Sequence, residues 1–100
     1  MALLSEAEIE DKLRTLLGWS RAGAEIAKQF TFNSFMPAID FVNRVAQAAE
    51  RAGHHPYITV NYNRVKLALS THSEGGITKK DINLASEINL LQDAVTIGRL

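Results

Sequence analysis

Residues 56–70 read PYITVNYNRVKLALS, and apolar and polar side chains alternate along most of this stretch. The apolar members are Ile58, Val60 and Tyr62 before a polar break at Asn63-Arg64, and Val65, Leu67 and Leu69 after it. A period of two is typical of β-strands. Two such runs on either side of a short polar break indicate a hairpin of two antiparallel strands. The hairpin requires a sheet, and the rest of the chain must complete it.

The same apolar side chains predict the register of this hairpin. Apolar side chains pair with apolar side chains if Tyr62 lies opposite Val65, Val60 opposite Leu67, and Ile58 opposite Leu69. A slip by one residue would turn the apolar side chains to the wrong face of the sheet. Continued outward, this register sets His55 opposite His72. Because cross-strand partners lie about 4.5–5.5 Å apart at Cβ, we expect these two histidines to converge at one end of the sheet.

The segments around the hairpin supply helices and a second hairpin. Apolar residues recur every three or four positions over residues 6–17, 35–51 and 79–97, which predicts three helices. The expected buried stripe of the second helix is Phe35, Ile39, Val42, Val45, Ala46 and Ala49, and that of the third is Ile82, Ala85, Ile88, Leu90 and Leu91. Ser5 with Glu8 is a capping box before the first helix, and Thr78 with Asp81 repeats it before the third, which is expected to end near Gly98. An extended segment after Trp19, a turn near Ala22-Gly23 and a strand at residues 25–32 form the other hairpin.

The predicted order of elements is α-β-β-α-β-β-α. Hairpins separated by helices favour an α+β fold with a four-stranded antiparallel sheet and three helices on one face. The chain has 100 residues, which suits one domain over residues 1–100.

Composition excludes several classes of function. Eleven basic and eleven acidic residues cancel, so no general charge attracts nucleic acid or an anionic membrane. The chain has no cysteine, so it has no disulfide, thiol nucleophile or cysteine-based zinc site. The acidic N-terminus does not resemble a signal peptide, and no apolar run has the length of a membrane span. We expect a cytoplasmic protein.

The three histidines, His54, His55 and His72, are the candidate functional residues. Pro56 holds His55 in extended backbone, where neighbouring side chains point to opposite sides, so His54 and His55 are expected to have different roles. Three explanations remain open: loop histidines without a function, a metal site, and acid–base catalysis, for which histidine is suited because it titrates near neutral pH. A metal site is disfavoured because adjacent histidines rarely bind one ion together.

Two further residues have alternative interpretations. Glu50 precedes His54 by about one helical turn, so it is either a solvated surface charge or a side chain that reaches a ligand. Trp19 is either a core residue or a lid over a flat ligand.

A longer pattern joins these residues. The segment Glu50-Arg51-Ala52-Gly53-His54-His55-Pro56 is followed by Tyr62-Asn63-x-Val65, by Ser70-Thr71-His72, by Gly75-Gly76 and by Asp81. With Trp19 and the upstream segment Lys28-Gln29-Phe30-x-Phe32-x-x-Phe35, this spacing resembles the pterin-4a-carbinolamine dehydratase family over essentially the whole chain. The chain departs from common members at Gly53 and at Tyr57-Ile58, which bears on the pocket rim and on the preferred pterin.

The resemblance implies the fold predicted above and a hydro-lyase activity. The substrate would be 4a-hydroxytetrahydrobiopterin or a related pterin, and the product the quinonoid dihydropterin of tetrahydrobiopterin recycling, with no metal or redox cofactor required. It implies catalytic roles for His54, His55 and His72, and a pterin pocket formed by Glu50, Gly53, Ser70, Thr71, Ser73 and Trp19.

The resemblance also implies a homodimer or homotetramer. Some relatives act instead as non-catalytic dimerisation cofactors of a homeodomain transcription factor or as assembly factors of a carbon-fixing enzyme, so a protein partner is the alternative function. Because all three histidines are present, the sequence favours the enzyme.

Overall fold

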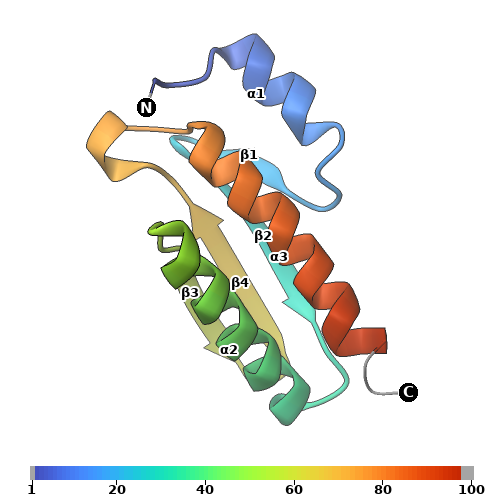
Figure 1. Ribbon diagram of the computed structural model, residues 1–100. Helices are drawn as coiled ribbons and strands as arrows, with labels where there is room; N and C mark the ends of the chain where they lie inside the picture. The colour runs from blue at the N-terminus through green and yellow to red at the C-terminus, as the bar shows by residue number, and fades with distance from the viewer. Residues whose placement is uncertain (1, 98–100) are drawn as a thin grey trace.

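The computed structural model describes residues 2–97. Within these residues, three α-helices and four strands follow one another in the predicted order, with one 3-10 helix between the last strand and the last helix (Figure 1). The elements are α1 (Glu6–Leu13), β1 (Ser20–Ala22), β2 (Glu25–Thr31), α2 (Phe35–Ala52), β3 (Tyr57–Asn61), β4 (Arg64–Leu69), η1 (His72–Glu74) and α3 (Lys79–Ile97).

The strands form one antiparallel sheet in the order β1-β2-β4-β3, so β4 lies between β2 and β3. The helices α2 and α3 lie across one face of this sheet, and α1 lies beside the β1 edge (Figure 1). Ile9 and Leu16 reach from the α1 region into the same core that α2 and α3 cover. The predicted α+β fold with a four-stranded antiparallel sheet is therefore confirmed.

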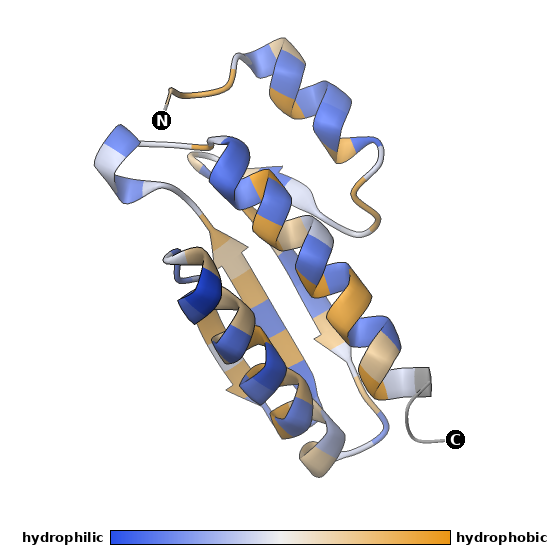
Figure 2. Cartoon of the chain, in the orientation of Figure 1, coloured by the Kyte–Doolittle hydropathy of each residue, from blue (hydrophilic) through white to orange (hydrophobic). Residues whose placement is uncertain are grey.

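The core lies between the sheet and the helices. Apolar and polar residues alternate along β4 (Figure 2), and Val65, Leu67 and Leu69 are completely buried. The ring of Phe41 from α2 lies 4.7 Å from the ring of Phe30 on β2, between centroids. Full burial of side chains of this size contributes about 1.5–3 kcal/mol each, so this layer is what holds α2 to the sheet.

The buried stripe of α2 differs from the prediction. Its fully buried apolar residues are Ala38, Phe41, Val45 and Ala48, with Ala49 nearly so. Of the six residues predicted, Phe35 and Ala46 are exposed, and Ile39 and Val42 are only partly buried. The predicted stripe was wrong because it omitted Phe41, whose ring packs on both Phe30 and Phe32 and thereby sets the rotation of the helix.

The predicted register of the second hairpin is wrong by two residues. Val60 faces Val65 and Ile58 faces Leu67, so the two-residue turn is Tyr62-Asn63. Tyr62 has a positive φ of 51°, and the Asn63 side chain donates to the Phe32 carbonyl at 2.8 Å. A shift by two keeps every side chain on its predicted face, so apolar pairing alone did not distinguish the two registers.

Helix α1 ends earlier than predicted, at Leu13 rather than at residue 17. After it, the amides of Arg14, Thr15 and Leu16 donate to the carbonyls three residues back. This tighter winding turns Leu16 into the core and leaves Leu17 82% exposed. The capping box of Ser5 and Glu8 is formed as predicted. The predicted end of the third helix at Gly98 lies outside the described residues.

Trp19 lies in the core, where its side chain is 5% exposed. Its indole N–H donates to Asn89 Oδ1 at 2.9 Å, and its ring meets Phe30 edge-on. The Lys28 ammonium donates to the same Asn89 oxygen. Burial lowers the pKa of Lys28, against the opposing effect of Asp93. This cluster attaches α3 to the segment that precedes β1.

Candidate active site

Three segments meet at one end of the sheet. Helix α2 ends at Gly53, whose left-handed backbone (φ 61°) turns the chain so that the His54 amide donates to Ala49 O at 3.1 Å. Strand β4 ends at Leu69 and continues into the loop that holds η1, and α3 begins nearby at Lys79. A pocket of about 270 Å³ opens between them. Its lining residues are Gly53, His54, His55, Ser70, Thr71, His72, Ser73 and Lys80.

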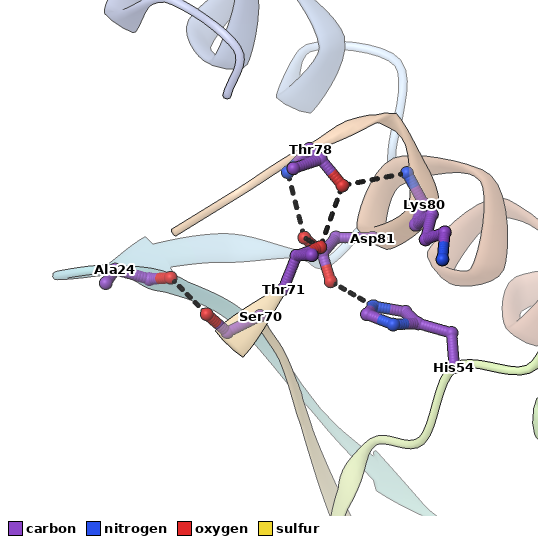
Figure 3. Close-up of polar contacts among 7 residues, drawn as sticks. All are labelled: Ala24, His54, Ser70, Thr71, Thr78, Lys80 and Asp81. Atoms are coloured by element: carbon purple, nitrogen blue, oxygen red, sulfur yellow. Dashed lines mark hydrogen bonds and ion pairs between the residues drawn. The ribbon is translucent and has the colours of Figure 1, made fainter. Parts of the chain in front are cut away.

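A buried carboxylate lies behind the pocket. Asp81, in the first turn of α3, is completely buried, and its Oδ1 lies 2.5 Å from His54 Nε2 (Figure 3). His54 is itself 9% exposed. A buried carboxylate without donors is strongly unfavourable, so its other partners decide whether this pair is stable.

Two threonines supply those partners. Asp81 Oδ2 accepts the Thr71 hydroxyl at 2.8 Å and the Thr78 backbone amide at 2.9 Å (Figure 3). An amide can only donate, so Oδ2 must be an acceptor. The arrangement of three donors around two oxygens is that of an ionised carboxylate. Asp81 therefore presents a negative charge to the His54 ring.

The other two histidines are exposed. His55 Nε2 lies 2.9 Å from Glu50 Oε2, and both of these side chains are mostly in solvent. His72 opens η1. His54 is buried and His55 is exposed, so these neighbouring side chains lie in different environments, as expected for extended backbone, and the difference in their roles stays a prediction.

The predicted convergence of His55 and His72 is found, but not by the predicted route. Both residues line the same pocket. In the observed register β3 and β4 pair Tyr57 with Ala68, and continuing this pairing outward sets His55 opposite Ser70 rather than His72. The loop that contains η1 turns back over the end of the sheet, as the bridge between Thr71 and Gly76 shows. The convergence therefore depends on this loop.

Some of the remaining predicted site residues line the pocket, and others do not. Gly53, Ser70, Thr71 and Ser73 line the pocket. Glu50 reaches it only through His55, and Trp19 is enclosed by the core. Thr71 directs its hydroxyl to Asp81, away from a substrate, and Ser70 directs its own to Ala24 O at 2.8 Å.

Sequence reasoning missed Asp81 and Lys80 as members of the site. Asp81 was recognised as the acid of a helix cap and as part of the family pattern but was given no role in the site, although a cap carboxylate next to a histidine-lined loop was an available signal. Lys80 gave no signal, because an exposed lysine in the first turn of a helix is ordinary.

Within residues 2–97, no group of three or more histidine, cysteine or acidic side chains lies close enough together to hold a metal ion. Over the same residues, no helix has the length and apolar character needed to cross a membrane.

Comparison with known proteins identifies the family. The family model described as pterin 4 alpha carbinolamine dehydratase matches residues 2–91. The chain belongs to the pterin-4a-carbinolamine dehydratase family. Together with the named relatives below, this match shows that the chain is a hydro-lyase, with the pterin-4a-carbinolamine dehydratase activity of the family.

Relatives in this family match most of the chain. A Roseiflexus castenholzii protein whose name assigns it to the dehydratases is 53% identical over 88% of this chain and 95% of its own length. A similarly named protein of Thermosynechococcus vestitus is 49% identical over 88% and 93%. The family model, over residues 2–91, includes the histidine segment and the start of α3, so the match covers the whole site.

Solved structures agree on the fold. A transcriptional coactivator/pterin dehydratase from Brucella melitensis superposes with a TM-score of 0.87 at 38% identity, and covers 90% of this chain and 98% of its own. A pterin dehydratase-like RuBisCO assembly factor of the alpha-carboxysome has a TM-score of 0.63 at 20% identity, over 74% and 86% of the two chains. The second likeness shows the fold alone.

Proposed function

We propose that the pocket at the end of β4 dehydrates 4a-hydroxytetrahydrobiopterin, with His54, His55 and His72 as the acid–base groups. The observation that carries this proposal is that all three histidines line one pocket and that one of them is backed by a buried carboxylate. Histidine is suited to donate and accept protons near neutral pH, so the pocket holds the kind of groups that acid–base chemistry requires.

The reaction needs two proton transfers and no redox change. The bond between C4a and the hydroxyl oxygen breaks, and a general acid protonates the leaving oxygen so that it departs as water. A general base takes the proton from the adjacent ring nitrogen, and the electron pair of that N–H bond forms the new C=N bond of the quinonoid product. Positioned acid–base groups contribute about 10²–10⁴-fold to such steps.

The contacts of His54 suit it to the base. Asp81 accepts a hydrogen bond from Nε2–H, which leaves Nδ1 with a lone pair. When Nδ1 takes the proton from the pterin, the ionised Asp81 stabilises the imidazolium that forms, as the aspartate of a serine-protease triad does. Because Asp81 is fixed by three donors, this stabilisation needs no reorganisation during the reaction.

The exposed histidines are placed for the leaving hydroxyl. His55 contacts Glu50, His72 is the first residue of the short helix η1, and both line the pocket. The proposal gives these two residues the proton for the departing oxygen and the orientation of the ring. Gly53, Ser70 and Ser73 complete the pocket wall. Trp19 is left out of the proposed pterin contacts because the core encloses it.

The proposal includes a homodimer or homotetramer. Strand β3 is an edge strand, and Tyr57, Val60 and Tyr62 on and beside it are exposed large apolar or aromatic residues. Unpaired strand edges with such side chains favour pairing with a second chain. Light scattering at micromolar concentration should give twice or four times the monomer mass, and a stable monomer would contradict it. The cytoplasmic location and the non-catalytic alternative remain predictions.

The enzymatic proposal is tested by following the loss of the 4a-hydroxypterin absorbance with purified protein. The wild-type chain should accelerate it, and His54→Gln, His55→Gln and His72→Gln should each lower kcat. We expect His54→Gln to lower kcat most, by about 10²–10⁴-fold. Asp11→Asn, a change on the exposed surface of α1, is the matched control and should retain the wild-type rate. A wild-type chain without activity on any 4a-hydroxypterin would refute the proposal.

A further inference from the structure

Two buried threonine hydroxyls are connected to Asp81 and are not needed to contact a substrate. Thr78 Oγ1 lies 2.7 Å from Thr71 Oγ1, which lies 2.8 Å from Asp81 Oδ2 (Figure 3). The Lys80 backbone amide donates to Thr78 Oγ1 at 3.2 Å. Thr71 is 5% exposed, and Thr78 and Asp81 are completely buried. The result is a continuous row of hydrogen bonds from the first turn of α3 to the carboxylate.

The direction of this row follows from proton counting. Each hydroxyl has one proton to donate. The carboxylate can only accept, so Thr71 gives its proton to Asp81 Oδ2. The contact between the two hydroxyls must then be a donation from Thr78 to Thr71, and Thr78 accepts from the Lys80 amide. Each hydroxyl proton is used once, and no second orientation of the two hydroxyls satisfies all of these contacts while Asp81 is ionised.

This row fixes which oxygen of Asp81 faces His54. Oδ2 is occupied by the Thr71 hydroxyl and the Thr78 amide, so Oδ1 is left for the His54 ring. The ring must then carry its proton on Nε2. In the part of the chain that the structure describes, every fully enclosed side-chain nitrogen or oxygen has a hydrogen-bond partner. Because no hydrogen bond of His54 involves Nδ1, that atom is not fully enclosed.

We propose that Thr71 is a positioning residue that holds His54 in the tautomer with Nε2 protonated and Nδ1 free to take a proton. This inference deepens the proposed function and rests on the role of His54 as a base. Thr71 acts on the reaction only through Asp81. The Thr78 hydroxyl contacts Thr71 and not Asp81, so its removal would leave Asp81 with all three of its direct donors.

The ring-nitrogen chemical shifts of His54, measured by NMR above the pH at which the imidazole is protonated, report the tautomer without any reference to activity. Wild-type protein should show a protonated Nε2 and a bare Nδ1. Thr71→Val, which keeps the shape but removes the hydroxyl, leaves Asp81 with one donor fewer, so the carboxylate can turn away from the ring. Both shifts should then move toward each other as the second tautomer becomes populated. It should also lower kcat about 10–100-fold, the loss expected for one hydrogen bond to a charged group, with little change in KM.

Two matched variants separate positioning from simple packing. Thr71→Ser keeps the donor and should restore the wild-type tautomer and most of kcat. Thr78→Val also removes a buried hydroxyl, yet it should leave the His54 shifts near those of wild type. A merely structural role predicts that Thr71→Val and Thr78→Val lower the melting temperature alike and leave both shifts unchanged, and this result would overturn the proposal.

The wild-type spectrum alone can also overturn the proposal, even if Thr71→Val does not fold, because a bare Nε2 contradicts the row of donors. Failure of the proposed function has a different signature. An inactive wild-type chain whose His54 has the protonated Nε2 would remove the catalytic role and leave the positioning of the ring intact.

Discussion

Replacement of Asp81 by asparagine exchanges one carboxylate oxygen for an amide nitrogen and should nearly abolish the reaction. Asp81 Oδ2 accepts from both Thr71 and Thr78, so the amide oxygen of Asp81→Asn must stay at that position. The amide nitrogen is then forced to face His54 Nε2, where Oδ1 now lies at 2.5 Å. This nitrogen is a donor, so Nε2 must become the acceptor and the His54 proton moves to Nδ1.

The expected size of the effect follows from the lost base. With its proton on Nδ1, the neutral ring cannot take one from the pterin. In serine proteases the same replacement lowers kcat about 10⁴-fold because the histidine has the wrong tautomer. Since a water molecule or another histidine can partly substitute in an open pocket, we expect a loss of about 10³–10⁴-fold, which equals about 4–5.5 kcal/mol of activation free energy.

The fold should survive this change. Asp81→Asn removes a charge from the first turn of α3 but keeps the size of the side chain, and it exchanges charge-assisted hydrogen bonds for neutral ones. We expect it to lower the free energy of unfolding by about 1–3 kcal/mol. Thermal unfolding followed by circular dichroism checks this, with Asp11→Asn as the exposed control.

Stopped-flow measurement of the 4a-hydroxypterin absorbance under single-turnover conditions gives the rate of the chemical step. If folded Asp81→Asn protein retained a rate within tenfold of wild type, the tautomer argument would be refuted. A small loss of rate together with complete loss of pterin binding would also contradict it, because it would make Asp81 a binding group.

Other predictions test the surroundings of the site. Phe41→Ala should lower the free energy of unfolding by about 3–5 kcal/mol, measured by denaturant titration, because the completely buried ring packs on Phe30. Trp19→Phe should lower the melting temperature and leave KM for the pterin unchanged; a raised KM would return Trp19 to the pocket. Hydrogen bonds from Ser5 lower the pKa of Glu8 below its usual value of 4.5. Wild type should therefore be more stable than Glu8→Gln above pH 4.5, and this difference should vanish as the pH falls through the lower pKa of the folded state.

The order of elements was predictable because the period of the apolar pattern changes at each boundary. The strand at residues 25–32 is found almost at its predicted limits, and the third helix begins at Lys79 as predicted, since a glycine turn precedes the strand and a cap precedes the helix. Register was not predictable from the same pattern. Val60 can pair with Leu67 or with Val65 without turning a side chain over, and the choice is made by the anchoring of Asn63 to Phe32.

The site was predictable as a set of histidines but not as a geometry. Their convergence depends on the loop after β4, whose path is set by the pairing of Thr71 with Gly76 rather than by strand register. The contact of Asp81 with His54 was not predicted, because the helix cap that Asp81 forms already explains an acidic residue at that position. Thr71 was placed in the pocket, but its hydroxyl is directed to the carboxylate. A partner that is distant in sequence and contacts a side chain leaves no periodic signal.

The central claim is that the three histidines of one pocket perform the dehydration. The measurement that tests it most directly is the single-turnover rate of 4a-hydroxypterin loss for wild type and for a variant in which His54, His55 and His72 are all replaced by glutamine, with folding verified for both. The account predicts a large acceleration by wild type and a return to the uncatalysed rate in the triple variant. A folded triple variant that dehydrates the pterin as fast as wild type would contradict it.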